Sequence, residues 1–255
     1  MIRVVLIGAG NVAIHLAKGL EKSETVRLLQ YFSRTDANAH YFSENIPHTK
    51  DLGSLVAADV YLIAVKDESI EEVASKISDR EGLVLHTSGS IPLESLRPSK
   101  RYGVLYPVQT FSKDRELDWK QIPLALEASS PDDMTLLRKL ASTLSDQLYE
   151  IDSARRKKLH LSAVFANNFS NHMFTLAKEL CEKNQLDFDL LKPLIAETGK
   201  KVKSIAPEDA QTGPARRNDL TVMEDQGNQL DSEKKIIYRV LSESISSRFP
   251  KNVKS

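Results

Sequence analysis

The chain has 255 residues, 41% of them apolar, and its 35 basic side chains are balanced by 35 acidic ones. This composition is typical of a folded globular protein, and it excludes the excess positive charge that favours nucleic acid or an anionic membrane as a partner. With Cys181 as the single cysteine, an intrachain disulfide is excluded and a reducing compartment is favoured. The apolar runs are too short to cross a bilayer, and a strand predicted from Ile2 onward leaves no room for a signal peptide, so we expect a cytoplasmic protein.

The first 152 residues alternate short β-rich runs with helical stretches. Residues 2–7 are almost continuously apolar, as in a strand that is buried on both faces of a sheet. Helical spacing follows over 12–20 and again over 69–77. Further strands are predicted over 26–32, 60–65, 83–86, 103–106, 124–126 and 148–151. Strands that alternate with helices indicate parallel pairing with right-handed crossovers, so we predict an α/β fold with a doubly wound parallel sheet over residues 1–152.

The pattern changes at Ser153, after which no strand is predicted. Ser153 is a candidate N-cap for a helix that contains no Gly or Pro as far as residue 184, and residues 155–158 are expected to form its solvated start. Three further helices are predicted, over 190–205, 220–226 and 233–248, the last of them capped by Ser232. We therefore predict an all-helical domain over residues 153–255, with a frayed tail from residue 249.

A glycine-containing turn directly follows the first strand. Gly8, Gly10 and Ala13 form the G-x-G-x-x-A pattern of a dinucleotide site, with Asn11 and Val12 between them at the start of the predicted helix. Gly8 permits the tight turn, Gly10 lets the backbone approach a pyrophosphate, and Ala13 lets the helix pack on the sheet. The helix N-terminus offers unpaired N–H groups to the phosphates. The sequence therefore predicts a dinucleotide site; the alternative is an ordinary strand–helix turn.

The tip of the second strand indicates which dinucleotide to expect. A site for NAD usually has Asp or Glu there, which binds the ribose 2′-hydroxyl, but this sequence reads Ser33-Arg34-Thr35. A guanidinium binds a phosphate through two N–H groups, and hydroxyls add further donors, so we predict NADP in preference to NAD. The alternative is that Arg34 is a solvent-exposed loop residue, and Asp36 is the residue that could reverse the preference.

Three further strands are expected to end at the same edge of the sheet. Ala64 and Val65 end the third strand and should contact the cofactor. Ser88 and Gly89 lie in a polar turn after the fourth strand, where hydroxyl and N–H groups could hold a carboxylate or carbonyl oxygen of the substrate. The alternative is a turn that caps the next segment. Gln109 follows the next strand and either contacts the substrate or braces its own loop.

The long predicted helix carries a polar quadrant beside an apolar stripe. At 100° per residue, His160, Asn167, Asn168 and Asn171 fall within one quadrant, which is expected to be partly buried. Because Asn is a poor helix former and a buried amide needs hydrogen-bond partners, the cluster suggests a site. His160 is the candidate to move the proton that accompanies hydride transfer, and Asn168 to orient a carbonyl or the nicotinamide amide. The alternative is a structural histidine with Asn side chains that bridge helices.

A loop over residues 212–219 combines turn residues with charged side chains. Arg217 is a candidate to pair with an anionic substrate, or the loop contacts a second subunit. Because the long helix has two apolar-leaning faces, a homodimer is expected.

The whole chain resembles the Rossmann-like oxidoreductases that carry a C-terminal helical domain of unknown function. Their relatives include pyrroline-5-carboxylate reductase, the deazaflavin-dependent NADP oxidoreductases and the 6-phosphogluconate dehydrogenase-like reductases. The resemblance rests on residues 8–13, 85–89, 107–111, 160–168 and 212–219. It implies NADP binding, a helical domain that makes a homodimer, and an active site between the domains.

The resemblance implies less about the reaction. In the β-hydroxyacid dehydrogenase branch a catalytic Lys lies four residues before a helix Asn; Asn168 matches that Asn, but the Lys position is Val164. Tyr106 stands where the family's His is expected. Some relatives act as ketopantoate reductases, which suggests a small 2-keto acid as substrate.

These observations together predict an NADP(H)-dependent oxidoreductase that acts on a small carbonyl or imine compound. The alternatives are a dinucleotide-binding sensor or scaffold without turnover, and deazaflavin–NADP hydride exchange. We expect no metal ion and no nucleic acid or membrane as partner.

Overall fold

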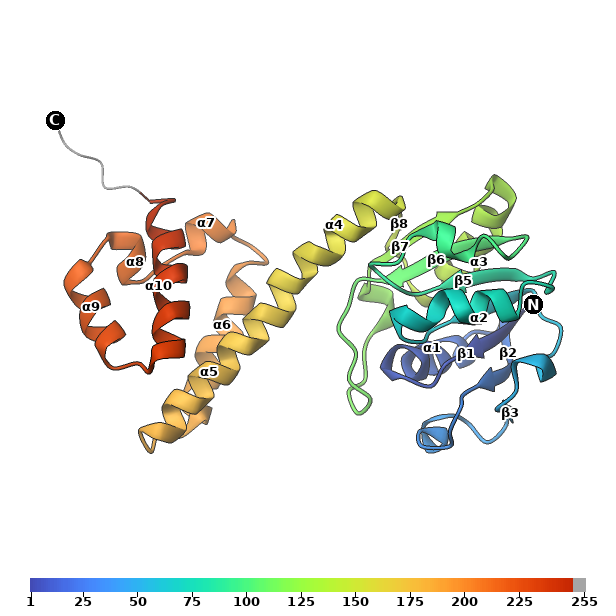
Figure 1. Ribbon diagram of the computed structural model, residues 1–255, viewed down its shortest axis with the longest axis horizontal. Helices are drawn as coiled ribbons and strands as arrows, with labels where there is room; N and C mark the ends of the chain where they lie inside the picture. Colours follow the sequence, from blue (N-terminus) through green and yellow to red (C-terminus); the bar gives the residue numbers. More distant parts are fainter. Residues whose placement is uncertain (250–255) are drawn as a thin grey trace. The chain divides into compact units, whose positions relative to one another are not determined.

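The computed structural model describes residues 1–249 and divides into two compact units, residues 1–169 and residues from 170 onward (Figure 1). The first unit therefore includes the helix that begins at residue 153. The predicted domain boundary between residues 152 and 153 stays a prediction, because a compact unit and a functional domain need not end at the same residue. Most of the predicted frayed tail, residues 250–255, lies outside the described residues.

The first unit is built on an eight-stranded sheet in the order β3-β2-β1-β4-β5-β6-β7-β8. Its strands are β1 (Ile2–Ile7), β2 (Val26–Phe32), β3 (His48–Thr49), β4 (Val60–Ile63), β5 (Leu83–His86), β6 (Tyr102–Pro107), β7 (Leu124–Ala128) and β8 (Leu148–Glu150). Neighbouring strands are parallel except β6 and β7, which are antiparallel. The prediction of parallel pairing throughout is wrong at this pair, because the β6–β7 connection contains only the one-turn helix η5 (Trp119–Gln121) and no crossover helix.

Helices cover both faces of the sheet. In β1 the side chains alternate: Val4 and Leu6 pack with α1 (Asn11–Glu21) and α3 (Pro131–Leu144), whereas Val5 and Ile7 pack with α2 (Ile70–Lys76). All four of these β1 side chains are fully buried. The predicted doubly wound α/β fold is thus confirmed. Helix α3 and the two-residue strand β3 were not predicted from the sequence.

One-turn helices occur in both units: η1 (Ala39–Tyr41), η2 (Leu52–Ser54), η3 (Asp67–Ser69), η4 (Leu93–Leu96) and, in the second unit, η7 (Phe188–Leu191). The predicted long helix consists of α4 (Ser153–Ala163), the π-helical turn η6 (Val164–Phe169) and α5 (Ser170–Lys183). Its N-cap is Asp152, whose carboxylate accepts the Arg155 N–H at 2.7 Å. The prediction of Ser153 as the cap is therefore wrong by one residue, because the Ser153 hydroxyl donates to Glu127 instead.

The second unit is helical throughout its described residues. After α5 it contains α6 (Lys192–Lys201), α7 (Pro207–Ala210), α8 (Pro214–Arg217), α9 (Leu220–Asn228) and α10 (Ser232–Ser246). The last helix is capped by Asp231, not by Ser232 as predicted, because the Asp231 carboxylate accepts the Lys234 N–H at 3.0 Å. Among residues 1–249, no helix combines the length and the apolar character that spanning a membrane requires.

Candidate active site

The order of the strands reverses at β1, which lies between β2 and β4. Ligands of doubly wound sheets bind outside the carboxyl ends of the strands at such a switch point. Gly8 follows β1 with φ of +127°, and a Cβ there would lie 2.1 Å from the carbonyl oxygen of Ala64 and 3.4 Å from Val65 Cγ1. Only glycine fits this turn, and the predicted residues Gly8, Ala64 and Val65 therefore lie together.

The start of α1 fits the phosphates of a dinucleotide. A Cβ added to Gly10 would meet no atom within 4 Å, so the space beside this residue is open to a ligand. Gly10 is the N-cap of α1, so no side chain caps the helix with a hydrogen bond. The first turn contains no acidic residue. Asn11, Val12 and Ala13 open the helix, and the first N–H groups of a helix lack intrahelical acceptors. These groups and the helix dipole favour an anion at this end of α1.

The predicted nucleotide-specificity turn lies directly after β2. The Ser33 side chain is buried, and its hydroxyl donates to the Thr35 carbonyl oxygen at 2.5 Å. Arg34 and Thr35 are exposed. The Ser33 hydroxyl proton is therefore used within the turn, whereas the Arg34 guanidinium and the Thr35 hydroxyl are accessible to a ligand.

Asp36, the residue that could reverse the preference for NADP, is engaged with two basic side chains. Lys50 Nζ lies 2.5 Å from Asp36 Oδ2, and His48 Nδ1 lies 3.3 Å from Asp36 Oδ1. The hydrogen bond from Lys50 is the main cause that holds the pKa of Asp36 below its ordinary value. Asp36 therefore carries its charge beside the compensating charge of Lys50.

A cavity of about 480 Å³ opens beside the start of α1 within the first unit. It brings together five of the predicted site residues: Asn11, Val12, Gln109, His160 and Asn168. Tyr106, at the end of β6, and Val164 also line it. The cavity thus joins the predicted phosphate-binding turn to the predicted proton-transfer residue.

Tyr106 and His160 form a hydrogen-bonded pair at this cavity. The Tyr106 hydroxyl lies 3.0 Å from His160 Nδ1, and the two rings meet edge to face at 5.9 Å. Tyr106 is buried, and this burial raises the pKa of its hydroxyl, partly offset by the charge of Arg156. The pair offers a hydroxyl and an imidazole that can exchange a proton with a ligand. Tyr106 was not predicted as a site residue, although its place at the end of a strand was a signal.

Gly89 makes room for this pair. A Cβ at Gly89 would lie 2.7 Å from His160 Nδ1 and 2.8 Å from Tyr106 Cζ. Ser88 lies just before it, where its Oγ accepts the N–H groups of Ser90 at 3.0 Å and Ile91 at 3.1 Å. Ser88 is buried and braces the turn. Its predicted contact with substrate stays a prediction.

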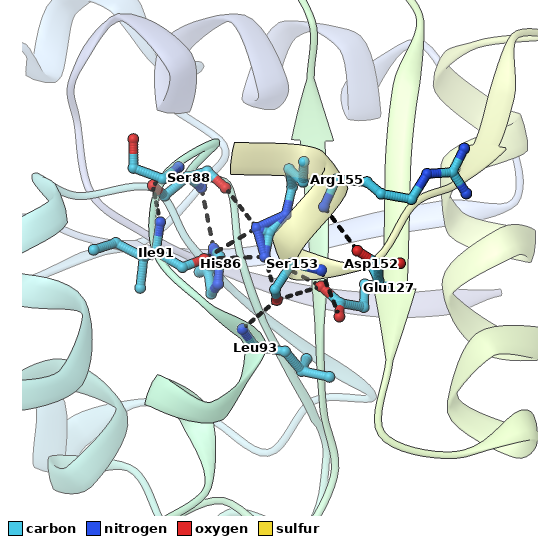
Figure 2. Close-up of polar contacts among 10 residues, drawn as sticks. His86, Ser88, Ile91, Leu93, Glu127, Asp152, Ser153 and Arg155 are labelled. Atoms are coloured by element: carbon cyan, nitrogen blue, oxygen red, sulfur yellow. Dashed lines mark hydrogen bonds and ion pairs between the residues drawn. The ribbon is translucent and has the colours of Figure 1, made fainter. Parts of the chain in front are cut away.

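A buried ionic network ties this turn to α4. The Arg156 side chain donates to the Ile91 carbonyl oxygen through both terminal nitrogens at 3.0 Å, to Ser153 Oγ at 2.9 Å and to Glu127 Oε2 at 3.1 Å. Figure 2 shows the Ser153 hydroxyl between Glu127, to which it donates, and the Leu93 N–H, from which it accepts. Arg156 is completely buried. The expectation of a solvated helix start is thus wrong at this residue, because the first turn of α4 packs on the turn after β5.

His86 ends β5 next to the turn at Ser88 (Figure 2). Its Nδ1 accepts the Ser88 N–H at 3.1 Å. Desolvation, assisted by the charge of Arg156, lowers the pKa of His86 to about 3. His86 is therefore neutral near pH 7 and acts as a fixed acceptor for the turn.

The Asn cluster lies partly in the π-helical turn. Asn167 and Asn168 line the cavity, with Asn167 Nδ2 3.4 Å from Asn168 Oδ1, and both are exposed. Asn171 is exposed on α5. The expected partial burial is wrong for these residues, because this stretch of the helix lies outside the cores of the described residues: Leu161, Phe165 and Phe169 are exposed as well. Helical turns of the π type often occur at functional sites.

Two predicted substrate residues lie at exposed positions. Gln109 lines the cavity, and its Oε1 accepts the Thr110 N–H at 2.8 Å, so it also braces its own loop. Arg217 ends α8 in the second unit and is exposed. The roles predicted for both residues stay predictions.

Comparison with known proteins gives two family matches and a set of solved structures. Residues 3–87 match the model for NADP oxidoreductase, coenzyme F420-dependent, and residues 122–245 match a domain of unknown function, DUF2520. A crystal structure from Bacteroides fragilis, provisionally named an NADP oxidoreductase, is 43% identical with a TM-score of 0.91; the match covers 97% of this chain and 98% of that one. No curated protein sequence matches the chain.

Two more distant solved structures show the same fold. A Thermotoga maritima protein is 21% identical with a TM-score of 0.81, over 96% of this chain and 98% of that one. Plasmodium falciparum pyrroline carboxylate reductase, solved with NADP bound, is 13% identical with a TM-score of 0.64, over 98% of each chain.

Proposed function

The chain belongs to the family of NADP oxidoreductases in which a Rossmann domain is followed by the DUF2520 domain, and we propose that it transfers a hydride between NADP(H) and a small carbonyl or imine compound. A 2-keto acid such as ketopantoate is the first substrate to test. The observation that carries the proposal is the cavity that links the start of α1 to the Tyr106–His160 pair.

The first unit carries the residues that would hold the nucleotide. The turn at Gly8 and Gly10 and the start of α1 would bind the pyrophosphate, as the open space beside Gly10 supports. Arg34 and Thr35 are exposed at the tip of β2 and would bind a 2′-phosphate. When bound, the nicotinamide supplies or accepts the hydride. Ala64 and Val65 would contact the same nucleotide from the end of β4.

Proton transfer is assigned to the residues around the cavity. Reduction of a carbonyl or imine needs one proton on the substrate oxygen or nitrogen. The Tyr106 hydroxyl and the His160 imidazole share a hydrogen bond, so one of them would donate this proton to the substrate and receive a proton from the other. Asn168 and Gln109, which line the cavity, would orient the substrate together with the turn at Ser88 and Gly89.

The second unit supports a homodimer. Its helices leave large apolar side chains exposed, among them Leu190 at 71% and Leu194 at 63%. It also contains an apolar cavity of about 530 Å³, lined by residues that include Leu176, Leu180 and Ile237. Exposed apolar surface of this kind marks an interface, so we propose that two copies of the chain associate through their second units.

The experiment tests binding first and turnover second. Trp119 is the single tryptophan, and its indole N–H donates to the His15 carbonyl oxygen of α1, so its fluorescence reports on the nucleotide site. We expect NADPH to quench it at lower concentration than NADH. The double substitution His160→Ala/Asn168→Leu should abolish reduction of the keto acids and imines that the wild-type protein accepts, while NADPH affinity stays unchanged. Unchanged turnover in that variant would overturn the assignment of the two residues.

The same screen separates two other functions. A deazaflavin as hydride partner is favoured by the family model that matches residues 3–87, and turnover with a deazaflavin alone would support it. A sensor without turnover is favoured by Val164, which stands where one branch of relatives has a catalytic Lys. Tight NADPH binding with no oxidation of NADPH by any keto acid, imine or deazaflavin would support the sensor.

A further inference from the structure

A two-residue edge strand lies beside the nucleotide-specificity turn. β3 pairs in parallel with the end of β2, with Tyr31 opposite His48 and Phe32 opposite Thr49. The Ser33 N–H donates to the Thr49 carbonyl oxygen at 3.1 Å. Because the two strands run parallel and end together, the residues that end β3 lie beside the turn that follows β2.

His48 is held against this turn by several contacts. Its ring stacks on Tyr31 at 4.6 Å with 14° between the planes. Its Nε2 lies 3.0 Å from Ser33 Oγ and 3.2 Å from the Ser33 carbonyl oxygen. These contacts turn the other ring nitrogen, Nδ1, toward Asp36 Oδ1 at 3.3 Å.

Lys50 completes the contacts of the Asp36 carboxylate. Its Nζ donates to Asp36 Oδ2 at 2.5 Å, so each carboxylate oxygen faces a basic side chain of the segment that contains β3. A free acid near this position would bind the two hydroxyls of an NAD ribose and would repel a 2′-phosphate. Lys50 occupies one oxygen of Asp36 and compensates its charge, which weakens both effects.

We propose that Lys50, assisted by His48, determines the preference for a 2′-phosphorylated nucleotide by keeping Asp36 paired. The inference rests on the proposed function, since it concerns the nucleotide of the same site. Arg34 then acts as the cationic contact for the phosphate without competition from the Asp36 carboxylate. Lys50 and His48 are specificity-determining residues that act through Asp36.

The test compares binding of the two reduced nucleotides by tryptophan fluorescence. Substitution Lys50→Gln removes the main partner of Asp36 and should lower the ratio of the NADH to the NADPH dissociation constant by about tenfold, or about 1.4 kcal/mol. His48→Phe retains a ring on Tyr31 and should lower the ratio by a smaller factor. The matched control is Lys100→Gln. Lys100 is an exposed lysine whose Nζ lies 2.5 Å from Glu81 Oε1; Lys100 lies before β6 and Glu81 before β5, at the amino ends of these strands. This control should leave the ratio unchanged.

A second substitution distinguishes an effect through Asp36 from a direct contact. In the Lys50→Gln background, Asp36→Asn removes the released charge and should return the ratio close to the wild-type value. A ratio that stays low in the double variant would show that Lys50 binds the phosphate itself, which would overturn the inference. A ratio unaffected by Lys50→Gln would overturn it as well.

The wild-type protein separates this inference from the proposed function. Binding of neither nucleotide would overturn both. Equal affinity for NADPH and NADH, with turnover retained, would overturn only the role of Lys50 and His48.

Discussion

The two units of the chain differ in how they bury apolar side chains. In the first unit both faces of the sheet are closed by helices, and Val4, Val5, Leu6 and Ile7 of a single strand have no exposed surface. In the described part of the second unit, the buried residues are small or polar: Cys181, Ala215, Gly227 and Ser242. Burial of one large apolar side chain stabilises a fold by about 1.5–3 kcal/mol. The first unit gains this stabilisation many times, whereas the large apolar side chains in the described part of the second unit all stay partly exposed.

The difference also concerns polar groups. In the first unit the Arg156 side chain is completely buried, and it donates hydrogen bonds to a carbonyl, a hydroxyl and a carboxylate oxygen. Desolvation lowers the pKa of this guanidinium, and the charge of Glu127 opposes that effect. A buried charge is tolerated only where the fold provides fixed partners, so the network fixes the first turn of α4 against the turn after β5.

The largest expected effect comes from breaking this network. Arg156→Met leaves Glu127 without its charged partner in a largely buried place, and should lower the free energy of unfolding by about 3–5 kcal/mol. The measurement is urea unfolding followed by circular dichroism. The control is Arg155→Met, because Arg155 is the exposed neighbour in the same turn and its loss should cost less than about 0.5 kcal/mol. Equal stability of the two variants would contradict the structural role of the network.

The second prediction tests the incomplete core of the second unit. Leu194→Asp on α6 should raise the dissociation constant of the homodimer by about a hundredfold, because the change occurs in both copies and each loses about 1.5 kcal/mol of apolar burial. Analytical ultracentrifugation measures the shift. Val56→Asp, a change at an exposed apolar residue of the first unit, should leave the dimer intact. A wild-type protein that is monomeric at micromolar concentration would contradict the homodimer.

The third prediction concerns the pH dependence of stability, which should depend on a buried histidine of the first unit and not on an exposed histidine of the second. The folded protein takes up a proton at His86 only near pH 3, whereas the unfolded chain takes it up near pH 6.5, so stability is lost as the pH falls from 6.5 toward 3. The expected slope is about 1.4 kcal/mol per pH unit within this window. Urea unfolding at pH 6.5, 5.5 and 4.5 measures it.

Two variants show whether the slope belongs to His86. His86→Asn retains an acceptor for the Ser88 N–H and should remove the slope. His172→Asn, at an exposed position of the second unit, should keep it. An unchanged slope in His86→Asn would mean that other groups cause the loss of stability.

The sequence by itself determined the frame of the first unit. The strands β1, β2 and β5 were predicted to the residue, because strands buried on both faces leave a mostly apolar run in the sequence. The turn at Gly8 was equally readable, since the position requires a backbone conformation that only glycine adopts without strain. Both predictions depend only on residues that are neighbours along the chain. His160 was also identified from its place on a helix, and it lies at the cavity.

Only the tertiary structure decided the contacts between distant segments. β3 is too short to show a period, and its pairing with β2 is what places His48 and Lys50 beside Asp36. Arg156 was predicted to be solvated, because its neighbours along the chain do not reveal the carbonyl and carboxylate groups that surround it in the fold. The Tyr106–His160 pair joins residues 54 positions apart. Such contacts depend on how strands and helices pack, and packing is a property of the whole chain rather than of any segment.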